Sequence, residues 1–145
     1  VYKRQVQQTT QEKQANTSST SQTLFNLKLL AYERIILFIE RIKPDSFIPR
    51  TLSPSLPYQE YQLLLINEIR KEFEYNLSQQ LYLSENAWEV TVNFKDNIIT
   101  LINSAATSCP PQATASDLAR KILEHYISSD LKGDQISKIV KAEIQ

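Results

Sequence analysis

The sequence predicts an all-α fold, an antiparallel bundle of four main helices plus a short C-terminal helix. Apolar residues recur at steps of three and four over long stretches, which is typical of amphipathic helices. The 145 residues include a single glycine, whereas the turns of sheet proteins use many. A chain of this length fits one domain with a modest core.

Residues 1–22 are predicted to be a polar tether or a helical extension, and residues 23–145 the helical bundle domain. The first segment is rich in Gln, Thr and Ser. It buries too little apolar surface alone to offset its ordering entropy, which favours a flexible tether. It also lacks glycine and proline, so a backward continuation of the next helix is the alternative.

The first four residues, Val1-Tyr2-Lys3-Arg4, resemble the trailing edge of a membrane helix. An interfacial aromatic followed by positive charges is common at that position. The chain contains no methionine. These residues leave open whether a membrane anchor precedes Val1; if it does, the positive-inside rule places this domain on the cytoplasmic side.

The first bundle helix is predicted at 23–42, where two adjacent apolar stripes indicate a wide buried face. Pro44 ends it, because the residue before a proline disfavours helical geometry. Residues 43–57 contain four prolines and are expected to form a long connector, held on the bundle surface by Phe47, Ile48 and Leu52.

The second helix is predicted to start near Pro57, since a proline is tolerated in the first turn. Its expected core positions are Tyr61, Leu65, Ile69, Phe73 and Leu77.

A helix–helix corner follows. Its short connector is expected at Leu81, Tyr82 and Leu83, and because these side chains are apolar it is not expected to be a plain surface loop. Ser84 is a good N-cap, because its hydroxyl can accept from an unpaired NH of the first turn. Leu83 and Trp88 then fall at N′ and N4, the pair that forms a hydrophobic staple. The corner is therefore assigned to Leu83, Ser84 and Trp88.

The third helix is predicted at 85–106. Cys109-Pro110-Pro111 then breaks the chain, and Thr114 is expected to cap the fourth helix with Asp117 at N3. Gly133 suits a C-cap of that helix. The expected apolar positions of the short last helix are Ile136, Ile139, Val140 and Ile144.

The residues that usually carry chemistry are sparse. His125 is the single histidine, so no histidine-based metal site or paired triad is predicted, and no cofactor. Cys109 is interpreted as an inert thiol, because reactivity requires an activating environment. Glu68 and Glu72 share a helix face, and the neighbouring Arg70 and Lys71 suggest a solvated charge cluster. We predict a protein that is not an enzyme.

Charge gives no sign of a nucleic-acid partner. Acidic and basic residues balance at 16 each, without the basic stripe that meets phosphates.

Uncharged polar side chains crowd the corner, and Asn76, Gln79 and Gln80 form the candidate interaction surface. These amides can satisfy backbone groups freed between two helices. They also suit a protein interface, because neutral hydrogen-bonding groups beside an aromatic are common there. The sequence leaves both interpretations open.

Three phrases resemble an uncharacterised bacterial family of short proteins. They are LLAYERIILFIERIKP at 29–44, EIRKEFEYNLSQQLYLSENAWE at 68–89 and TLINSAA at 100–106. The resemblance implies one N-terminal transmembrane helix followed by a helical soluble domain, and hence an inner-membrane location. This chain departs from the family in lacking that membrane helix, so the anchor is implied and not observed. No activity, ligand or catalytic residue follows from it.

Two functional hypotheses remain. The first is a membrane-tethered adaptor or assembly subunit that contacts a protein partner. The second is a regulatory or ligand-binding domain with a small pocket between helices, lined by Tyr32, Tyr61, Tyr82 and Trp88, because such pockets are mostly apolar with a few polar groups.

Overall fold

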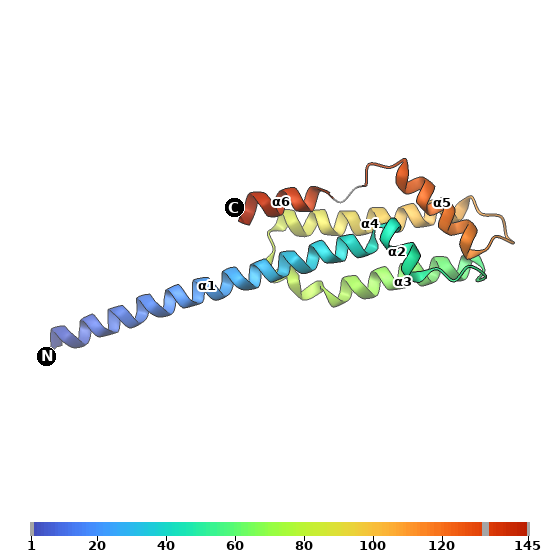
Figure 1. The fold of residues 1–145 in the computed structure, drawn as a ribbon. Coiled ribbons are helices and arrows are strands. Elements are labelled where there is room, and N and C mark those ends of the chain that lie inside the picture. The colour runs from blue at the N-terminus through green and yellow to red at the C-terminus, as the bar shows by residue number, and fades with distance from the viewer. Residues whose placement is uncertain (1, 132–133, 145) are drawn as a thin grey trace.

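The computed structural model describes residues 2–131 and 134–144, which are almost entirely helical (Figure 1). Within these ranges there is no strand, and the predicted all-α bundle is confirmed. The elements in chain order are α1 (Tyr2–Ile42), α2 (Pro44–Thr51), α3 (Tyr58–Tyr75), the 3₁₀ helix η1 (Leu77–Tyr82), α4 (Glu85–Thr107), α5 (Ala115–Ile127) and α6 (Asp134–Ile144).

Helix α1 is much longer than the predicted helix at 23–42. It begins at Tyr2. The described part of the polar segment is therefore a helical extension of the bundle helix and not a flexible tether. Extending an existing helix adds one hydrogen bond per residue without a second nucleation cost. The added residues project beyond the bundle (Figure 1) and, at about 1.5 Å per residue, span roughly 30 Å. Val1 lies outside the described residues.

Three long helices, α1, α3 and α4, lie side by side, and α3 runs antiparallel to both α1 and α4, which run in the same direction (Figure 1). Helix α5 packs obliquely on α3 and α4 at one end, and α6 packs on α4 and α1 at the other. The core lies between these helices. Its largest fully buried side chains are Tyr32, Tyr61, Phe38, Phe47, Ile35, Ile39, Ile42, Leu65, Ile69, Ile98, Ile102 and Leu118.

The connector predicted at 43–57 is wrong over half its length, because α2 occupies Pro44–Thr51. Pro44 sits in its first turn, where a missing NH costs nothing. Pro49 lies inside the helix and removes one hydrogen bond. Burial of Phe47 and Ile48 offsets that loss, since both are at most 4% exposed.

The predicted caps of the fourth helix have different outcomes. Thr114 and Asp117 form a capping box at the start of α5, as predicted. The C-cap prediction is wrong: α5 ends at Ile127 with Ser128 as its C-cap, and Gly133 lies outside the described residues. The loop before α5 is fixed to the start of α3, because Tyr58 N donates to Ala113 O at 3.1 Å and Ala115 N to Leu56 O at 2.7 Å.

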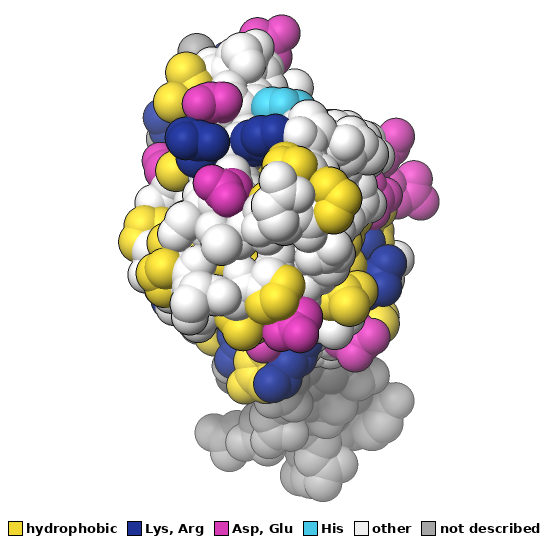
Figure 2. Space-filling view, turned by 90° about the vertical axis from the view of Figure 1, so that its right-hand side faces the viewer, with side chains coloured by type: hydrophobic (Ala, Val, Ile, Leu, Met, Phe, Trp, Pro, Cys, Tyr) yellow, Lys and Arg dark blue, Asp and Glu magenta, His cyan; other side chains and the backbone are white. Residues whose placement is uncertain are grey.

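The end of the bundle where α4 meets α5 has a mixed surface. Side chains of both charges are interspersed there with single apolar ones (Figure 2). Across the part of the chain that the structure describes, no helix combines the length and hydropathy that a membrane span needs.

Candidate interaction surface

The turn from α3 to α4 is longer than the predicted three-residue connector. Helix α3 ends at Tyr75, η1 follows at Leu77–Tyr82, and Ser84 caps α4. Two apolar residues predicted to be covered are exposed, Leu77 at 46% and Leu81 at 82%. The cause is the change from 3.6 to three residues per turn, which carries them off the buried face of α3.

Ser84 makes the predicted N-cap and two further contacts. Its Oγ accepts from Ala87 N at 3.0 Å and donates to Glu143 Oε1 at 2.5 Å. Its backbone NH donates to Tyr32 Oη at 3.4 Å. Three helices, α1, α4 and α6, therefore meet at this one residue.

Trp88 joins the corner to the core through an aromatic row. Its ring stacks on Phe73 with centroids 5.4 Å apart and an interplanar angle of 27°. Phe73 lies 6.0 Å from Phe38 of α1, and Lys95 Nζ lies 4.1 Å from the Phe73 centroid. Leu83 and Trp88 are both partly buried against the core, while a direct staple between them stays a prediction.

The three candidate amides are in different surroundings. Asn76 is the C-cap of α3, and its Nδ2 donates to Glu72 O at 2.8 Å. Gln79 is partly buried and contacts Ser78 Oγ at 3.4 Å, while Gln80 is exposed. Asn76 alone of the three lines a neighbouring cleft.

That cleft runs between α1 and α3 and has a volume of about 520 Å³. One wall is a single face of α1, and the other is a single face of α3 with its C-cap. The lining residues are Arg34, Leu37, Phe38, Arg41, Glu68, Lys71, Glu72, Tyr75 and Asn76.

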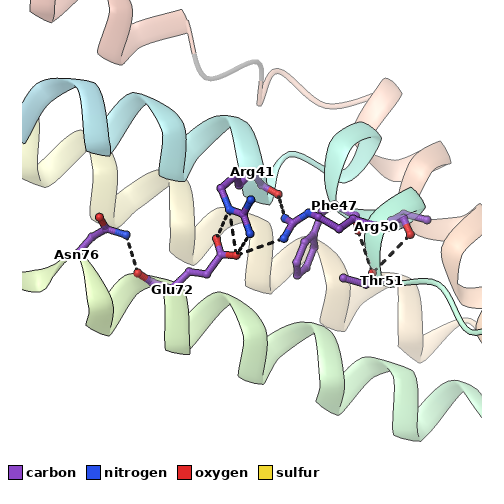
Figure 3. Close-up of polar contacts among 7 residues, drawn as sticks. Arg41, Phe47, Arg50, Thr51, Glu72 and Asn76 are labelled. Atoms are coloured by element: carbon purple, nitrogen blue, oxygen red, sulfur yellow. Dashed lines mark hydrogen bonds and ion pairs between the residues drawn. The ribbon is translucent and has the colours of Figure 1, made fainter.

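Arg41 and Arg50 contact Glu72, a residue of the α3 wall of the cleft (Figure 3). Arg41 donates from Nη2 to Glu72 Oε1 at 2.8 Å, and from Nε to Oε1 and Oε2 at 3.2 and 3.3 Å. Arg50 reaches Oε1 at 3.4 Å and donates to Arg41 O at 2.8 Å. The hydrogen bond with Glu72 raises the pKa of Arg41.

The surface-cluster interpretation of Glu72 is therefore wrong. Its side chain is only 17% exposed and pairs across helices with arginines 31 and 22 residues away. Arg70 and Lys71 are two and one positions from it, respectively, and such neighbours do not face each other on a helix.

Two cations of the cleft are unpaired. Within the described residues, the side chains of Arg34 and Lys71 make no ion pair or hydrogen bond, whereas the charge of Glu68 acts on Arg41. Beside them stand two exposed apolar side chains, Leu37 at 53% and Tyr75 at 80%. The cleft thus combines a bonded charge cluster with two unpaired cations and apolar surface.

A family model matches this chain over residues 1–145, and its description is Family of unknown function (DUF7935). The chain belongs to this family. No curated protein and no solved structure matches it. The predicted resemblance to an uncharacterised family is confirmed at that level.

Of the residues predicted to line the pocket of the ligand-binding alternative, Tyr61 lies apart from Trp88 in this DUF7935 chain. Tyr61 is fully buried and bonds through its hydroxyl to Thr51 Oγ1 at 2.9 Å. Trp88 stacks on Phe73, which is twelve residues further along α3 and hence about 18 Å away. Tyr32 lines a second, apolar cleft of about 270 Å³ between α1 and α6, which shares Leu37 with the cleft between α1 and α3.

The cysteine and the histidine of the DUF7935 chain are not arranged for catalysis. Cys109 is buried, and its Sγ donates to Ala105 O at 3.7 Å. Burial raises the pKa of this thiol, which disfavours the nucleophilic thiolate. His125 lies in the last turn of α5 and is partly buried. Among the described residues, no group of three His, Cys, Asp or Glu side chains could hold a metal ion.

Proposed function

We propose that this protein is a non-enzymatic adaptor or assembly subunit that acts through protein–protein contacts. The cleft between α1 and α3 is the observation that carries the proposal. Its exposed side chains are apolar and cationic together, which is typical of docking surfaces and unusual on a face that meets only water.

Apolar exposure continues along the α1 wall of the cleft. Leu30 is 54% and Leu37 53% exposed, and residues seven apart lie on the same face of a helix. Tyr75 adds a large ring from α3 at 80% exposure. Tyrosine and arginine are enriched at protein interfaces because each offers apolar area together with hydrogen-bonding groups.

We propose further that the protein is bacterial and tethered to the inner membrane, with the bundle on the cytoplasmic side. The flank pattern at Val1–Arg4 and the resemblance of the three sequence phrases support this. The projecting part of α1 fits the role of a spacer, because roughly 30 Å of helix would hold the bundle away from the lipid surface.

The test uses the full-length protein, tagged at its C-terminus and expressed in its native host. We expect it in the inner-membrane fraction, with a protein partner that co-purifies in stoichiometric amount. Leu37→Asp places a charge in the cleft and should abolish co-purification. Leu63→Asp is the matched control, because Leu63 is a 62% exposed leucine of α3 outside the cleft.

Three results would contradict these proposals. A soluble full-length protein would overturn the membrane tether. The absence of a stoichiometric partner would overturn the adaptor role. Equal loss in both leucine variants would mean that the cleft is not the contact site.

One cleft supports the alternative function, binding of a small ligand. The cleft between α1 and α6 is nearly all apolar, lined by Leu29, Tyr32, Glu33, Ile36, Leu37 and Val140. Native mass spectrometry of the purified protein tests it, and a small molecule retained at one per chain would favour this function over the adaptor.

A further inference from the structure

We infer that the cleft between α1 and α3 binds an acidic amphipathic helix of the partner protein. This inference rests on the proposed adaptor role and specifies the chemistry of the partner. Three observations carry it: the charge of the cleft, the arrangement of its free cations, and its length.

The cleft is positive although the chain is neutral overall. Arg34, Arg41 and Lys71 line it, and Arg50 reaches into its charge cluster, against two carboxylates from Glu68 and Glu72. The lining itself, with three cations and two anions, has a net charge of +1, and Arg50 adds a further cation beside Glu72, in a chain of net charge 0. An acidic partner would be favoured and a basic one repelled.

The free cations are placed to meet carboxylates beside an apolar contact. Arg41 is already bonded to Glu72, whereas Arg34 and Lys71 make no ion pair among the described residues. They line the same cleft as the exposed Leu37 and Tyr75. The adjoining turn at 76–84 carries no charged residue, so it offers Arg34 no acid. Carboxylates of a partner can supply the missing counter-charges.

The dimensions and the backbone favour a helix as occupant. The α3 wall runs from Glu68 to Asn76, about 12 Å along the axis, and two helical turns span about 11 Å. A helix satisfies its own backbone groups. An extended segment that binds by strand addition needs a strand edge to pair with, and the described residues contain no strand. An amphipathic helix in a groove makes contacts at i, i+3, i+4 and i+7, which suits this length.

The test measures binding of a synthetic probe to the whole chain. The probe is a fluorescein-labelled helical peptide of about 14 residues, with leucines at i, i+4 and i+7 and glutamates at flanking positions. A second peptide has lysine in place of every glutamate. We expect saturable fluorescence anisotropy with the acidic peptide only, weakening as NaCl rises from about 0.05 to about 0.5 M.

Charge reversal in the chain locates the site. The double variant Arg34→Glu with Lys71→Glu should weaken acidic-peptide binding by at least about tenfold and should bind the lysine peptide instead. Arg70→Glu is the matched control, because Arg70 is an exposed cation next to Lys71 that does not line the cleft. It should leave binding within about twofold. Circular dichroism should show all variants folded, since these side chains are unpaired and exposed surface changes cost little.

Each contrary result overturns the inference. No binding of the acidic peptide, equal binding of both peptides, or equal effects of Arg70→Glu and the double variant would each do so. Failure here is distinguishable from failure of the adaptor role. If a partner co-purifies with full-length protein but the double variant retains it, the adaptor stands and the acidic-helix inference falls.

Discussion

Replacing Trp88 with alanine removes the ring that connects the start of α4 to the core. Trp88 stacks on Phe73 at 5.4 Å, and Phe73 in turn lies 6.0 Å from Phe38 of α1. Lys95 Nζ lies 4.1 Å from the Phe73 centroid. Losing the indole therefore leaves Phe73 without its stacking partner and opens a void between α3 and α4.

The expected cost follows from the extent of burial. Truncating a fully buried tryptophan costs about 3–5 kcal/mol. Stacking of two aromatic rings stabilises the fold by about 0.5–1.5 kcal/mol beyond the burial of their area. Because Trp88 is only partly buried, we expect about 2–3 kcal/mol for Trp88→Ala. For a domain of this size that lowers Tm by about 5–10 °C.

Urea and thermal unfolding followed by far-UV circular dichroism measure this loss, since the variant has no tryptophan. Tyr75→Ala is the control: its ring is 80% exposed, so its cost should stay within about 0.5 kcal/mol. A double-mutant cycle of Trp88→Ala with Phe73→Leu should give a coupling of about 0.5–1.5 kcal/mol. A Trp88→Ala protein as stable as the wild type, or wild-type tryptophan emission readily quenched by iodide, would refute the reasoning.

Four smaller effects are expected. Glu72→Gln should cost about 1 kcal/mol in urea unfolding, less at high salt, because its arginine partners are substantially exposed, whereas Glu68→Gln should be neutral. The backbone hydrogen bond from the N-cap lowers the pKa of Asp117. Its stabilisation of the fold is therefore present above about pH 4 and is lost as pH falls further. In Asp117→Asn the free energy of unfolding should depend less on pH in this acid range. Burial raises the pKa of Tyr61, so stability should fall above about pH 10, less steeply in Tyr61→Phe, which should itself cost about 1 kcal/mol. Gln80→Ala should stay within about 0.5 kcal/mol, because its side chain is exposed.

The parts of the fold that depend on local rules could be predicted from the sequence. The 3.6-residue period placed the third predicted helix at 85–106, and α4 covers Glu85–Thr107. The end of α1 before Pro44, the N-cap at Ser84 and the capping box of Thr114 and Asp117 needed only the residues within one turn. Ser84 and Thr114 both cap as expected.

Local rules failed where tertiary burial overrides them. Four prolines favoured a loop at 43–57, yet α2 forms because Phe47 and Ile48 enter the core at 2% and 4% exposure. Leu81 looked too apolar for a surface position and is 82% exposed. Side-chain hydrophobicity alone does not state which face of a short 3₁₀ helix turns inward.

The candidate cleft could be predicted only in part. Arg34, Leu37 and Arg41 are spaced at three and four, so the sequence does place them on one face of a helix. Their partner wall on α3 is 31 residues away along the chain, and the register between the two helices depends on the packed core. That register decides that Arg41 bonds to Glu72 and that Arg34 has no partner. A local sequence pattern does not contain this information.

One turn of α3 connects the corner to the cleft. Glu72 bonds to Arg41, Phe73 stacks on Trp88, and Asn76 caps the helix by bonding back to Glu72 O. Consecutive residues on a helix point about 100° apart, so this turn holds the cleft charges with one side chain and the aromatic row with the next. A change at Trp88 can therefore shift the Arg41–Glu72 pair without touching a partner. Loss of partner binding in Trp88→Ala would not by itself make Trp88 a contact residue, whereas the same loss from charge reversal at Arg34, with Tm unchanged, would identify the cleft as the docking surface.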